Sequence, residues 1–407
     1  MRILIANDGF EDAGGVQQYL DAVAGALIAR GHHVAVMHRD VVRGPGTSLF
    51  SSLPQFSVVT AGMDAAIAAA RAWRPDVCYS HNMNVLEVDA ALASTMPVVK
   101  FMHGYFGTCV SGLKQHAWPT PTPCDRAFGP MCAALFFPRR CGQASVTVLR
   151  RQYAWTRRQH DLFPRYRAIV VASEHMRREY LRNGADASSV QTIPLFATCA
   201  PLASPELPTA EPHVAFLGRM TPLKGSELLI QAVAIANAAL GESIRLTMIG
   251  AGPDRARYQD IARRAGVNGD IIPWQTGPER FALLRRAHLV AIPSTWPEPF
   301  GLVGLEASAN GVPAIAFNIG GITEWLRPGI NGILVDAQPP TADAFGRALA
   351  DAFVNRDRLV AMREQALGVA RDMSLARHVD RLEQLLARCC DASDTQHVVK
   401  EARWARG

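Results

Sequence analysis

Two glutamates eight positions apart are the strongest chemical signal in the sequence. Glu298 precedes the segment Pro-Phe-Gly-Leu, residues 299–302. Glu306 lies about two turns into the helix that we expect Gly301 to open, and this spacing lets both carboxylates face one cleft. Ionised carboxylates only accept hydrogen bonds, so the pair suits the hydroxyls of a ribose and a sugar ring. A loop glutamate followed by a solvated helix glutamate is the alternative.

A basic loop lies upstream of this pair. Residues 216–225 read Phe-Leu-Gly-Arg-Met-Thr-Pro-Leu-Lys-Gly and continue from an expected strand. Arg219 offers a bidentate guanidinium and Lys224 a point charge, so the loop is predicted to clamp a diphosphate. The chain has only four lysines, so the presence of one in this loop is informative. A solvated turn is the alternative interpretation.

Three glycines follow two expected strands of the same half. Gly218 comes after residues 213–217, and Gly250 and Gly252 come after residues 246–249. Glycines at such places let backbone amides approach a ligand where a helix begins. Alone the pattern is weak, because turns between strands and helices often contain glycine.

The elements that must position these residues alternate between strand and helix, which predicts an α/β fold with parallel sheets. The expected strands are residues 2–6, 33–38, 77–80, 97–102, 168–172, 190–193, 213–217, 246–249 and 289–293. Five prolines and little periodicity in residues 194–212 predict a linker. We therefore expect domains at 1–195 and 213–375, a linker at 196–212, and helices at 376–407.

In order and spacing, these motifs resemble the retaining glycosyltransferase family 4, whose architecture of two Rossmann-like domains is called GT-B. The resemblance covers residues 213–335 and includes Gly311-Val312-Pro313, Gly320-Gly321 and the turn at 328–332. It implies two domains whose sheets face a central cleft, the first binding the acceptor and the second the nucleotide sugar. The helices at 376–407 are then expected to cross back to the first domain.

The resemblance also implies roles. Arg219 and Lys224 would bind the donor diphosphate, Glu298 the hydroxyls of the donor sugar, and Glu306 the ribose. The donor would also contact Phe300, Gly301, Leu302, Gly218, Gly250 and Gly252. Glu298 is not expected to be a nucleophile, because such enzymes use front-face attack with the donor phosphate taking the acceptor proton. No Asp-x-Asp occurs in the chain, so no catalytic metal is expected.

The N-terminal half has two further candidates. Gly14 and Gly15 precede a long expected helix and resemble the family's glycine loop, whose amides and helix N-terminus face the diphosphate. A tight turn is the alternative. His103 directly follows the expected strand 97–102, where the family places a residue near the transferred sugar, but a structural histidine remains equally open.

Four of the eight cysteines fall within one proline-rich stretch of low periodicity, the insert at residues 104–145. Such a long connection needs something to order it. In a reducing compartment clustered cysteines favour a metal over disulfides, and four thiolates suit a structural zinc site. The spacing lacks paired C-x2-C motifs, so free buried thiols remain the alternative. The predicted ligands are Cys109, Cys124, Cys132 and Cys141, with His116 as a substitute.

The net charge of +6 resides entirely in residues 1–195. Residues 139–182 hold eleven arginines and three acidic residues. This basic segment is predicted to meet an anionic membrane or a lipid-diphosphate acceptor; a solvated helix face is the alternative. No nucleic-acid reader motif and no apolar run of 18 residues occur. Residues 1–8 lack signal-peptide features, so we expect a cytoplasmic protein, peripheral to the inner face of the plasma membrane.

Together these features predict a retaining glycosyltransferase that moves a sugar from a nucleotide-diphosphate sugar to a glycan, lipid-linked or other acceptor. Two alternatives have the same architecture. A sugar-nucleotide 2-epimerase would lack the Glu298–Glu306 motif beside the Arg219–Lys224 loop. A non-catalytic sugar-nucleotide-binding subunit would have lost residues of the diphosphate clamp, and none is lost here.

Overall fold

A computed structural model describes the chain except for residues 11–14, 40–48, 253–254, 276–277, 337 and 392–407. The N-terminal domain is built on a seven-stranded parallel sheet in the order β3-β2-β1-β4-β5-β8-β9. The strands are β1 Arg2–Ala6, β2 His33–His38, β3 Gln55–Ser57, β4 Val77–Ser80, β5 Val98–Met102, β8 Ala168–Val171 and β9 Val190–Thr192.

The C-terminal domain contains a second parallel sheet, with six strands in the order β12-β11-β10-β13-β14-β15. Its central strands are buried along their whole length, as expected for parallel strands covered by helices on both faces. The strands are β10 His213–Leu217, β11 Arg245–Ile249, β12 Gly269–Ile272, β13 Leu289–Ile292, β14 Ala314–Phe317 and β15 Gly332–Val335.

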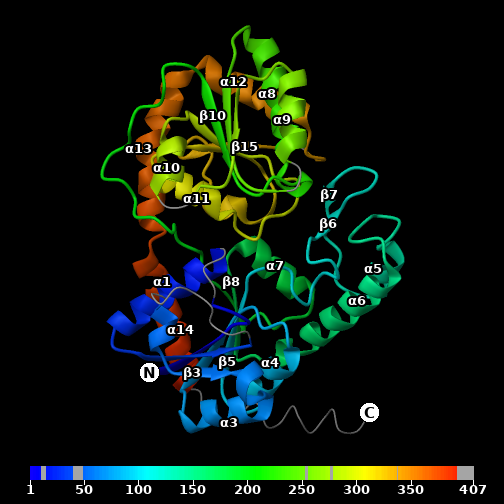
Figure 1. The fold of residues 1–407 in the computed structure, drawn as a ribbon, viewed down its shortest axis with the longest axis vertical. Helices are drawn as coiled ribbons and strands as arrows, with labels where there is room; N and C mark the ends of the chain where they lie inside the picture. The colour runs from blue at the N-terminus through cyan, green and yellow to red at the C-terminus, as the bar shows by residue number, and fades with distance from the viewer. Residues whose placement is uncertain (11–14, 40–48, 253–254, 276–277, 337, 392–407) are drawn as a thin grey trace.

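Helices cover both sheets, and the two domains lie one above the other in Figure 1. The helices are α1 Gly15–Ala29, α2 Val58–Ala61, α3 Met63–Ala72, α4 Leu86–Ala93, α5 Pro130–Leu135, α6 Val146–Asp161, α7 Glu174–Arg182, α8 Ser226–Leu240, α9 Arg255–Arg264, α10 Pro278–Arg285, α11 Leu302–Ala309, α12 Ala342–Val354, α13 Arg356–Asp372 and α14 Leu375–Asp391. Polar caps fix several starts: Ser145 and Ser173 accept hydrogen bonds from the amides of Val148 and Met176.

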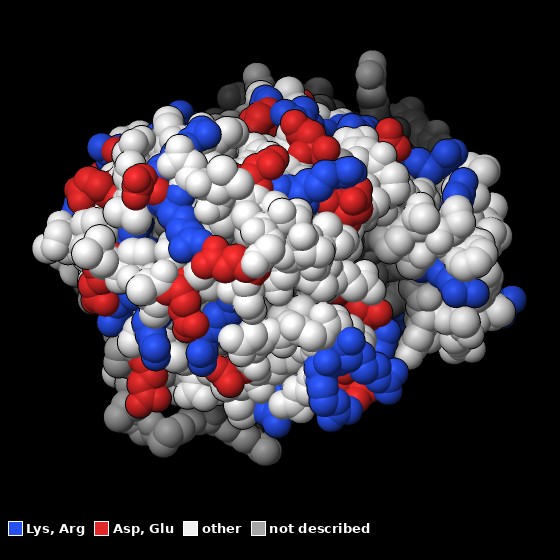
Figure 2. Space-filling model, turned by 90° about the horizontal axis from the view of Figure 1, so that it is seen from above, with Lys and Arg blue, Asp and Glu red and all other residues white. Residues whose placement is uncertain are grey.

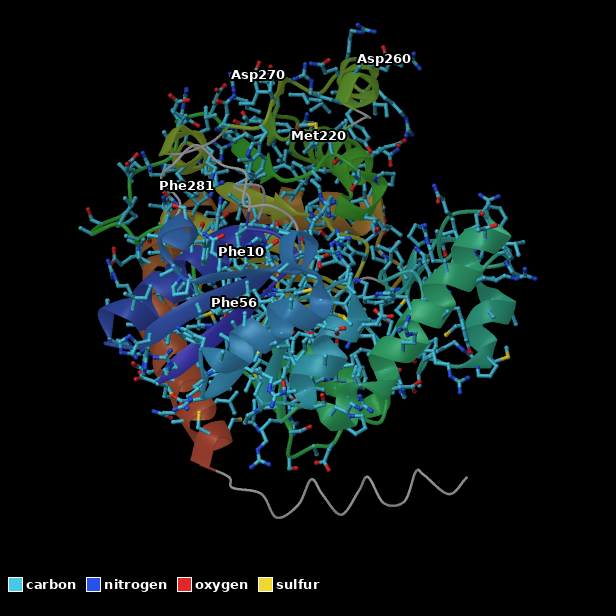
Figure 3. All side chains as sticks on the ribbon, turned by 60° about the horizontal axis from the view of Figure 1, so that its bottom comes forward. Phe10, Phe56, Met220, Asp260, Asp270 and Phe281 are labelled. Atoms are coloured by element: carbon cyan, nitrogen blue, oxygen red, sulfur yellow. The ribbon has the colours of Figure 1, made fainter. Side chains whose placement is uncertain are left out.

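Buried apolar side chains form one cluster that runs through both domains and two that each belong to a single domain. Phe10, which follows β1, packs on Phe50 with ring centroids 4.5 Å apart and belongs to the shared cluster. Met220, which follows β10, is fully buried in the cluster of the C-terminal domain. Figure 3 labels both side chains.

The last described helix returns to the N-terminal domain. Helix α14 contacts α1 and β4, and its apolar side chains belong to the cluster that spans both domains. Its His378 binds Tyr19 Oη through Nε2 at 2.8 Å and the carbonyl of Pro194 through Nδ1 at 2.7 Å. One buried imidazole therefore joins α14, α1 and the connection between the two domains.

The insert forms a lobe beside the main body. It contains the two-residue strands β6 Gln115–His116 and β7 Thr122–Pro123, which pair antiparallel, and helix α5, and it leads into α6. Figure 1 shows β6, β7, α5 and α6 projecting from the right side of the molecule. Figure 2 also shows a hollow that separates this lobe from the rest of the surface.

The predicted fold class is confirmed: the protein is α/β with two parallel sheets in separate domains. Several strands were not predicted. The edge strands β3 and β12 are short, and β12 begins with Gly-Asp, a pair disfavoured in strands. Strands β14 and β15 were also missed. Among the described residues, no helix is long and apolar enough to cross a bilayer.

Buried histidines make stability depend on pH. Burial, ahead of nearby cationic groups, lowers the pKa of His175, His288 and His378 to about 4. Below about pH 6.5 the unfolded chain therefore binds protons that the folded chain does not, and folding free energy is lost down to about pH 4. Each such histidine contributes a slope of up to about 1.4 kcal/mol per pH unit.

We expect the free energy of unfolding, measured in urea at pH 7, 6 and 5, to fall at each step. The variant His378→Gln should be less stable at pH 7 but should lose less stability between pH 7 and 5 than the parent. His33→Gln, at an exposed position, is the matched control and should keep the parent slope. Equal slopes in the parent and His378→Gln would contradict the assignment.

Candidate active site

The candidate site lies where the strand order of the C-terminal sheet reverses. Strand β10 is flanked by β11 on one side and β13 on the other, so the loops that follow β10 and β13 diverge from a common point. Ligands of open α/β sheets bind in such crevices at the carboxyl ends of strands. The loop after β10 contains Arg219 and Lys224, and the loop after β13 contains Glu298.

Lys224 and Glu298 form the central ion pair of the site. Lys224 Nζ lies 2.5 Å from Glu298 Oε1, which also accepts a hydrogen bond from Ser294 Oγ at 2.6 Å. Glu298 is 6% exposed. Burial acts to raise the pKa of its carboxyl, but Lys224 and the Ser294 hydroxyl outweigh it, and the pKa is lowered overall. Glu298 is therefore an ionised carboxylate fixed on a lysine.

Glu306 has different partners. Its Oε1 lies 3.2 Å from Arg280 Nη2 and accepts the hydroxyl of Thr198, whereas Oε2 takes no hydrogen bond from the described residues. Burial raises its pKa, against Arg280 and Thr198. Since α11 begins at Leu302, Glu306 lies just over one turn into the helix, and the expected two turns were wrong. The sequence did not suggest Arg280, whose neighbours in α10 are ordinary helix residues.

Arg219 stands apart from this network. Its side chain is exposed and has no hydrogen bond or ion pair with any described residue. The structure thus brings Lys224 to Glu298 but leaves Arg219 free at the end of β10. An exposed guanidinium in the same loop as Lys224 is available for an anionic ligand.

Gly250 and Gly252 have a packing role in the contact between their loop and the loop of Gly218. The amide of Gly218 donates to Ile249 O at 3.0 Å, and that of Met220 donates to Ala251 O at 2.9 Å. A β-carbon on Gly250 would lie 1.9 Å from Gly218 O, and one on Gly252 would lie 2.4 Å from Met220 O. The two loops are thus bound to each other, and the contact of these glycines with a donor stays a prediction.

The amide groups at the start of α11 are the other donors near Glu298. Gly301 caps the helix in the left-handed conformation with φ of 81°, and its carbonyl accepts the amide of Gly304. The first amides of a helix have no partner within it. Leu302 begins the helix and is half-buried, while Phe300 is buried and packs into the core that spans both domains. Phe300 therefore supports this turn from below.

Across from this site, the predicted glycine loop is only partly visible. Gly14 lies outside the described residues. Gly15 begins α1, and a β-carbon placed on it would meet no atom within 4 Å. Packing against the described residues therefore gives no reason for glycine at this position, and the approach of Gly15 to a ligand at the N-terminus of α1 stays a prediction beside the tight turn.

His103 pairs with His81 at the carboxyl ends of β5 and β4. His103 Nε2 lies 2.9 Å from His81 Nδ1, and the ring of Phe101 packs on His103 at 4.2 Å between centroids. Burial, then Lys100 and His378, lowers the pKa of His103 to about 3, and the pKa of His81 is lowered as well. Both rings are therefore neutral at pH 7, which the sequence did not indicate.

The loop 295–299 is held by the opposite domain. Gln115 Nε2 donates to the carbonyl of Thr295 at 2.6 Å, Tyr105 Oη to that of Pro297 at 2.6 Å, and Ser173 Oγ to that of Pro299 at 2.6 Å. These donors follow β5 and β8 or lie in the insert. The carboxyl edges of the two sheets therefore face each other across the segment that carries Glu298. None of the three donors was a candidate in the sequence.

A cavity of about 110 Å³ adjoins this contact. It lies between the insert, α7 and the loop that carries Glu298, and it is lined by Tyr105, Lys114, Pro123, Cys124, Asp125, His175, Glu179, Arg182 and Pro297. Lys114 and Glu179 form a buried ion pair at 2.5 Å on its wall. The cavity combines charged and aromatic groups, which are suited to bind a polar ligand.

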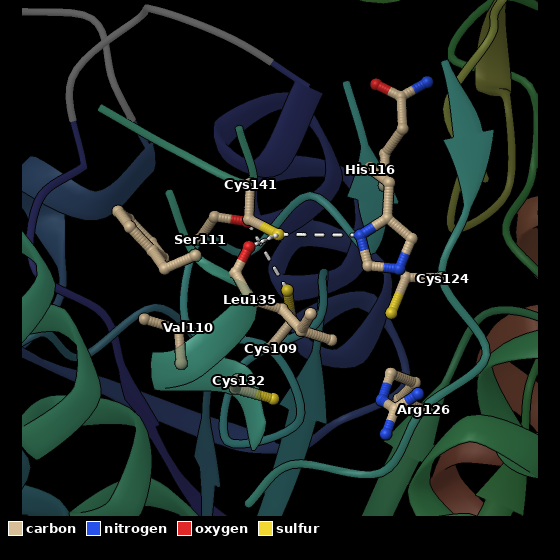
Figure 4. Close-up of a pocket in the computed structure, with 11 residues that line it drawn as sticks. Cys109, Val110, Ser111, His116, Cys124, Arg126, Cys132, Leu135 and Cys141 are labelled. Carbon is tan, nitrogen blue, oxygen red and sulfur yellow. Dashed lines mark hydrogen bonds between the residues drawn. The ribbon is translucent and has the colours of Figure 1, made fainter. Parts of the chain in front are cut away.

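The four cysteines of the insert converge. Cys109, Cys124, Cys132 and Cys141 line one cavity of about 30 Å³ together with His116 (Figure 4). Cys141 Sγ lies 3.6 Å from His116 Nδ1. Burial, followed by the charges of the other three thiols, raises the pKa of Cys141 to about 11. The described residues contain no group of three His, Cys, Asp or Glu already arranged to hold a metal ion.

Two parallel sheets whose carboxyl edges face each other define the GT-B class of proteins. Solved structures share this fold: the complex of Anabaena HepE with UDP is 17% identical and covers 95% of this chain and all of its own, with a TM-score of 0.65. The family model for glycosyl transferases group 1 matches residues 202–368, and the model for glycosyltransferase family 4 matches residues 13–197. The chain belongs to glycosyltransferase family 4.

Curated relatives agree with this family. A D-inositol 3-phosphate glycosyltransferase of Nocardia farcinica is 33% identical over 237 residues, 53% of this chain and 51% of that protein. One of Segniliparus rotundus is 27% identical over 363 residues, 82% of this chain and 76% of that protein. This chain matches the first three such relatives over 33–51% of their length.

Proposed function

We propose that the protein is a retaining glycosyltransferase that transfers a sugar from a nucleotide-diphosphate sugar to a hydroxyl of a glycan, lipid-linked or other acceptor. The observation that carries the proposal is the Lys224–Glu298 pair at the reversal of strand order, with Arg219 in the same loop and without a side-chain partner among the described residues. The binding of UDP by HepE, which shares the fold, supports a nucleotide-diphosphate donor.

In this proposal the chain binds charge rather than forming a covalent intermediate. The bond between the anomeric carbon and the diphosphate oxygen breaks, and its electron pair remains on the phosphate. The acceptor oxygen bonds to the same face of that carbon, and its proton passes to the phosphate oxygen. Arg219 and Lys224 stabilise the developing negative charge, which is usually the largest catalytic contribution. No catalytic metal is required.

Glu298 and Glu306 would hold the hydroxyls of the donor. Fixed by Lys224, Glu298 keeps its second oxygen for the transferred sugar, and Glu306 offers Oε2 to the ribose. The amides of Gly301 and Leu302 and the glycines of the paired loops would face the phosphates, with Gly15 on the other side.

The histidine pair suggests how His103 would contact the sugar. His81 Nε2 is buried without a hydrogen-bond partner among the described residues. Because a buried N–H without an acceptor is rarer than an unsatisfied acceptor, we place the proton of His81 on Nδ1, donated to His103 Nε2. His103 then holds its own proton on Nδ1, where it serves as a neutral donor to a sugar hydroxyl.

The direct test of the function is nucleotide release. The full chain would be incubated with a panel of nucleotide-diphosphate sugars, with and without glycan or lipid-linked acceptors, and the product linkage determined by NMR. We expect acceptor-dependent release of nucleoside diphosphate and a product of unchanged anomeric configuration. Conversion of the donor to its 2-epimer, or donor binding without release, would support one of the two alternative functions instead.

We also propose that the lobe contacts an anionic membrane. It exposes large apolar side chains, Trp118 at 50%, Met131 at 51%, Phe137 at 41% and Val146 at 56%. The arginines at 139, 140, 150 and 151 are exposed near them in the sequence, and Arg140 stacks on Trp118 at 4.7 Å. Apolar groups beside cations are suited to an interface with anionic lipid.

Vesicle sedimentation tests this contact. We expect binding to vesicles containing phosphatidylglycerol and little binding to phosphatidylcholine alone. Replacing Arg150 and Arg151 with glutamate should weaken binding, by about 1 kcal/mol for each cation lost. The matched control replaces Arg263 and Arg264, an exposed pair on α9, in the same way. Equal loss of vesicle binding in both variants would mean that net charge, and not the lobe, determines the binding.

A further inference from the structure

The lobe lacks a hydrophobic core of its own. Within residues 107–145, Val110 and Phe136 are the large apolar side chains that are buried, and neither belongs to the three core clusters. Regular structure in this stretch is limited to β6, β7 and the single helix α5. Small segments with little apolar burial generally need a cross-link or a metal ion to be ordered.

Cysteine thiols converge at the centre of the lobe. Four thiols from four separate parts of the stretch, before β6, after β7, within α5 and after α5, line the same small cavity (Figure 4). Its volume of about 30 Å³ fits one ion and excludes a sugar or a nucleotide. All eight cysteines of the chain are free, so no disulfide provides the cross-link.

The contacts of the thiols resemble the outer shell of a thiolate metal site. The amide of Lys114 donates to Cys109 Sγ at 3.3 Å, and the hydroxyl of Ser111 lies 3.5 Å from the same sulfur. Donors of this kind stabilise negative charge on ligating sulfurs. Cys132 and Cys141 form long contacts with the carbonyls of Ala127 and Leu135, at 3.9 and 3.8 Å, which rotation of the thiols would break at little cost. Cys141 Sγ also lies 3.6 Å from His116 Nδ1, the side chain that adjoins the cavity.

The same thiols border residues that reach the active site. Cys109 accepts the amide of Lys114, and the amide of Cys124 donates to the carbonyl of Lys114 at 2.7 Å. Lys114 is held in the left-handed region, with φ of 49°, directly before Gln115. Gln115 is the residue that binds Thr295 in the loop carrying Glu298. Cys124 also lines the cavity beside that loop.

We propose that Cys109, Cys124, Cys132 and Cys141 bind one zinc ion, with His116 adjoining the site, and that this ion positions Gln115 against the loop that carries Glu298. Four thiolates complete a closed tetrahedral site with Zn–S distances of about 2.3 Å, which leaves no coordination position for catalysis. Soft sulfur ligands select zinc over magnesium or calcium. Gln115 is then a positioning residue, and the metal acts through it.

Elemental analysis of the full chain, purified without added metal or a metal-affinity step, is the first test. We expect one zinc per chain, and loss of that zinc in Cys132→Ser. Cys390→Ser, outside the lobe, should retain it. Zinc near zero with four thiols that titrate freely in the native protein would overturn the proposal, as would disulfides or iron at these positions. None of these outcomes depends on glycosyl transfer.

The positioning role has its own measurements. Removal of zinc by a chelator should make the lobe sensitive to trypsin at Arg126, Arg139 and Arg140, and should leave the affinity for free nucleoside diphosphate unchanged. Gln115→Ala should keep its zinc and its nucleotide affinity but lower kcat by about tenfold, near the upper end for one lost hydrogen bond. Unchanged kcat in Gln115→Ala would refute the link to the Glu298 loop while leaving the zinc site standing.

Discussion

Replacing Lys224 with alanine is expected to lower kcat/KM by on the order of 10²-fold or more, which corresponds to about 2.7–4 kcal/mol of lost transition-state stabilisation. Arg219→Ala should have an effect of the same order, because the two cations share one loop and one leaving group. Steady-state kinetics with the donor identified by the panel would measure both. Near-normal turnover in both variants would show that Arg219 and Lys224 do not bind the diphosphate of the donor.

The pH profile separates two roles of Lys224. Burial raises the pKa of Glu298, and in the parent Lys224 overcomes this effect. Without the lysine, burial prevails and Glu298 takes a proton at higher pH. The residual activity of Lys224→Ala should therefore decline on the acidic side at a higher pH than that of the parent. Lys224→Arg, which keeps the charge, should restore the parent pH profile in part. If the acidic decline in the activity of Lys224→Ala occurs at the same pH as in the parent, Lys224 does not control the protonation of Glu298, and its contact with the phosphate is the role that remains.

The second large effect concerns the two glutamates. We expect substitution of one to weaken nucleotide binding and substitution of the other to slow catalysis. Glu306→Gln should weaken the affinity for free nucleoside diphosphate by about 10–100-fold, the value of a lost hydrogen bond to a charged group. Glu298→Gln should leave that affinity unchanged and lower kcat, on the order of 10²-fold. The reason is that ribose contacts exist with free nucleotide, whereas sugar contacts exist only with the donor.

Calorimetry with the nucleotide, beside kinetics with the full donor, measures this separation. Because Glu306 also pairs with the buried Arg280, its loss can destabilise the domain. Thr198→Val removes the other partner of the same oxygen and serves as the matched control for local disturbance. If Glu298→Gln and Glu306→Gln behave alike, the assignment of sugar and ribose is wrong.

The sequence predicted those parts of the fold that depend on local patterns. Strands β1, β2, β4 and β10 were expected at the bounds that they have, because buried parallel strands appear as short apolar runs between polar loops. The same locality made Lys224 and Glu298 visible, since each lies in the loop that follows a recognisable strand. Strands β3 and β12 lie at sheet edges, where apolar patterning is weak.

What the sequence did not predict depends on contacts between distant segments. Gln115 and Thr295 are 180 positions apart, Tyr105 and Pro297 are 192 apart, and Thr198 and Glu306 are 108 apart. No periodicity or composition links such pairs; only the packing of one domain on the other does. The convergence of the four cysteines could be suspected from their count, but their shared cavity required the fold.

The three hydrogen bonds that hold loop 295–299 have a consequence for how such proteins diversify. All three acceptors are main-chain carbonyls, and the three donors are side chains of the opposite domain. Any residue supplies a carbonyl, so mutations in the loop can change the chemistry of the donor side without removing these three acceptors; only the Thr295 hydroxyl, which Gln115 also contacts at 3.1 Å, would be lost with its side chain. A chimera that combines this N-terminal half with the C-terminal half of a relative would keep the junction wherever the backbone path is conserved. Recombination between halves is therefore open to evolution and to the protein engineer.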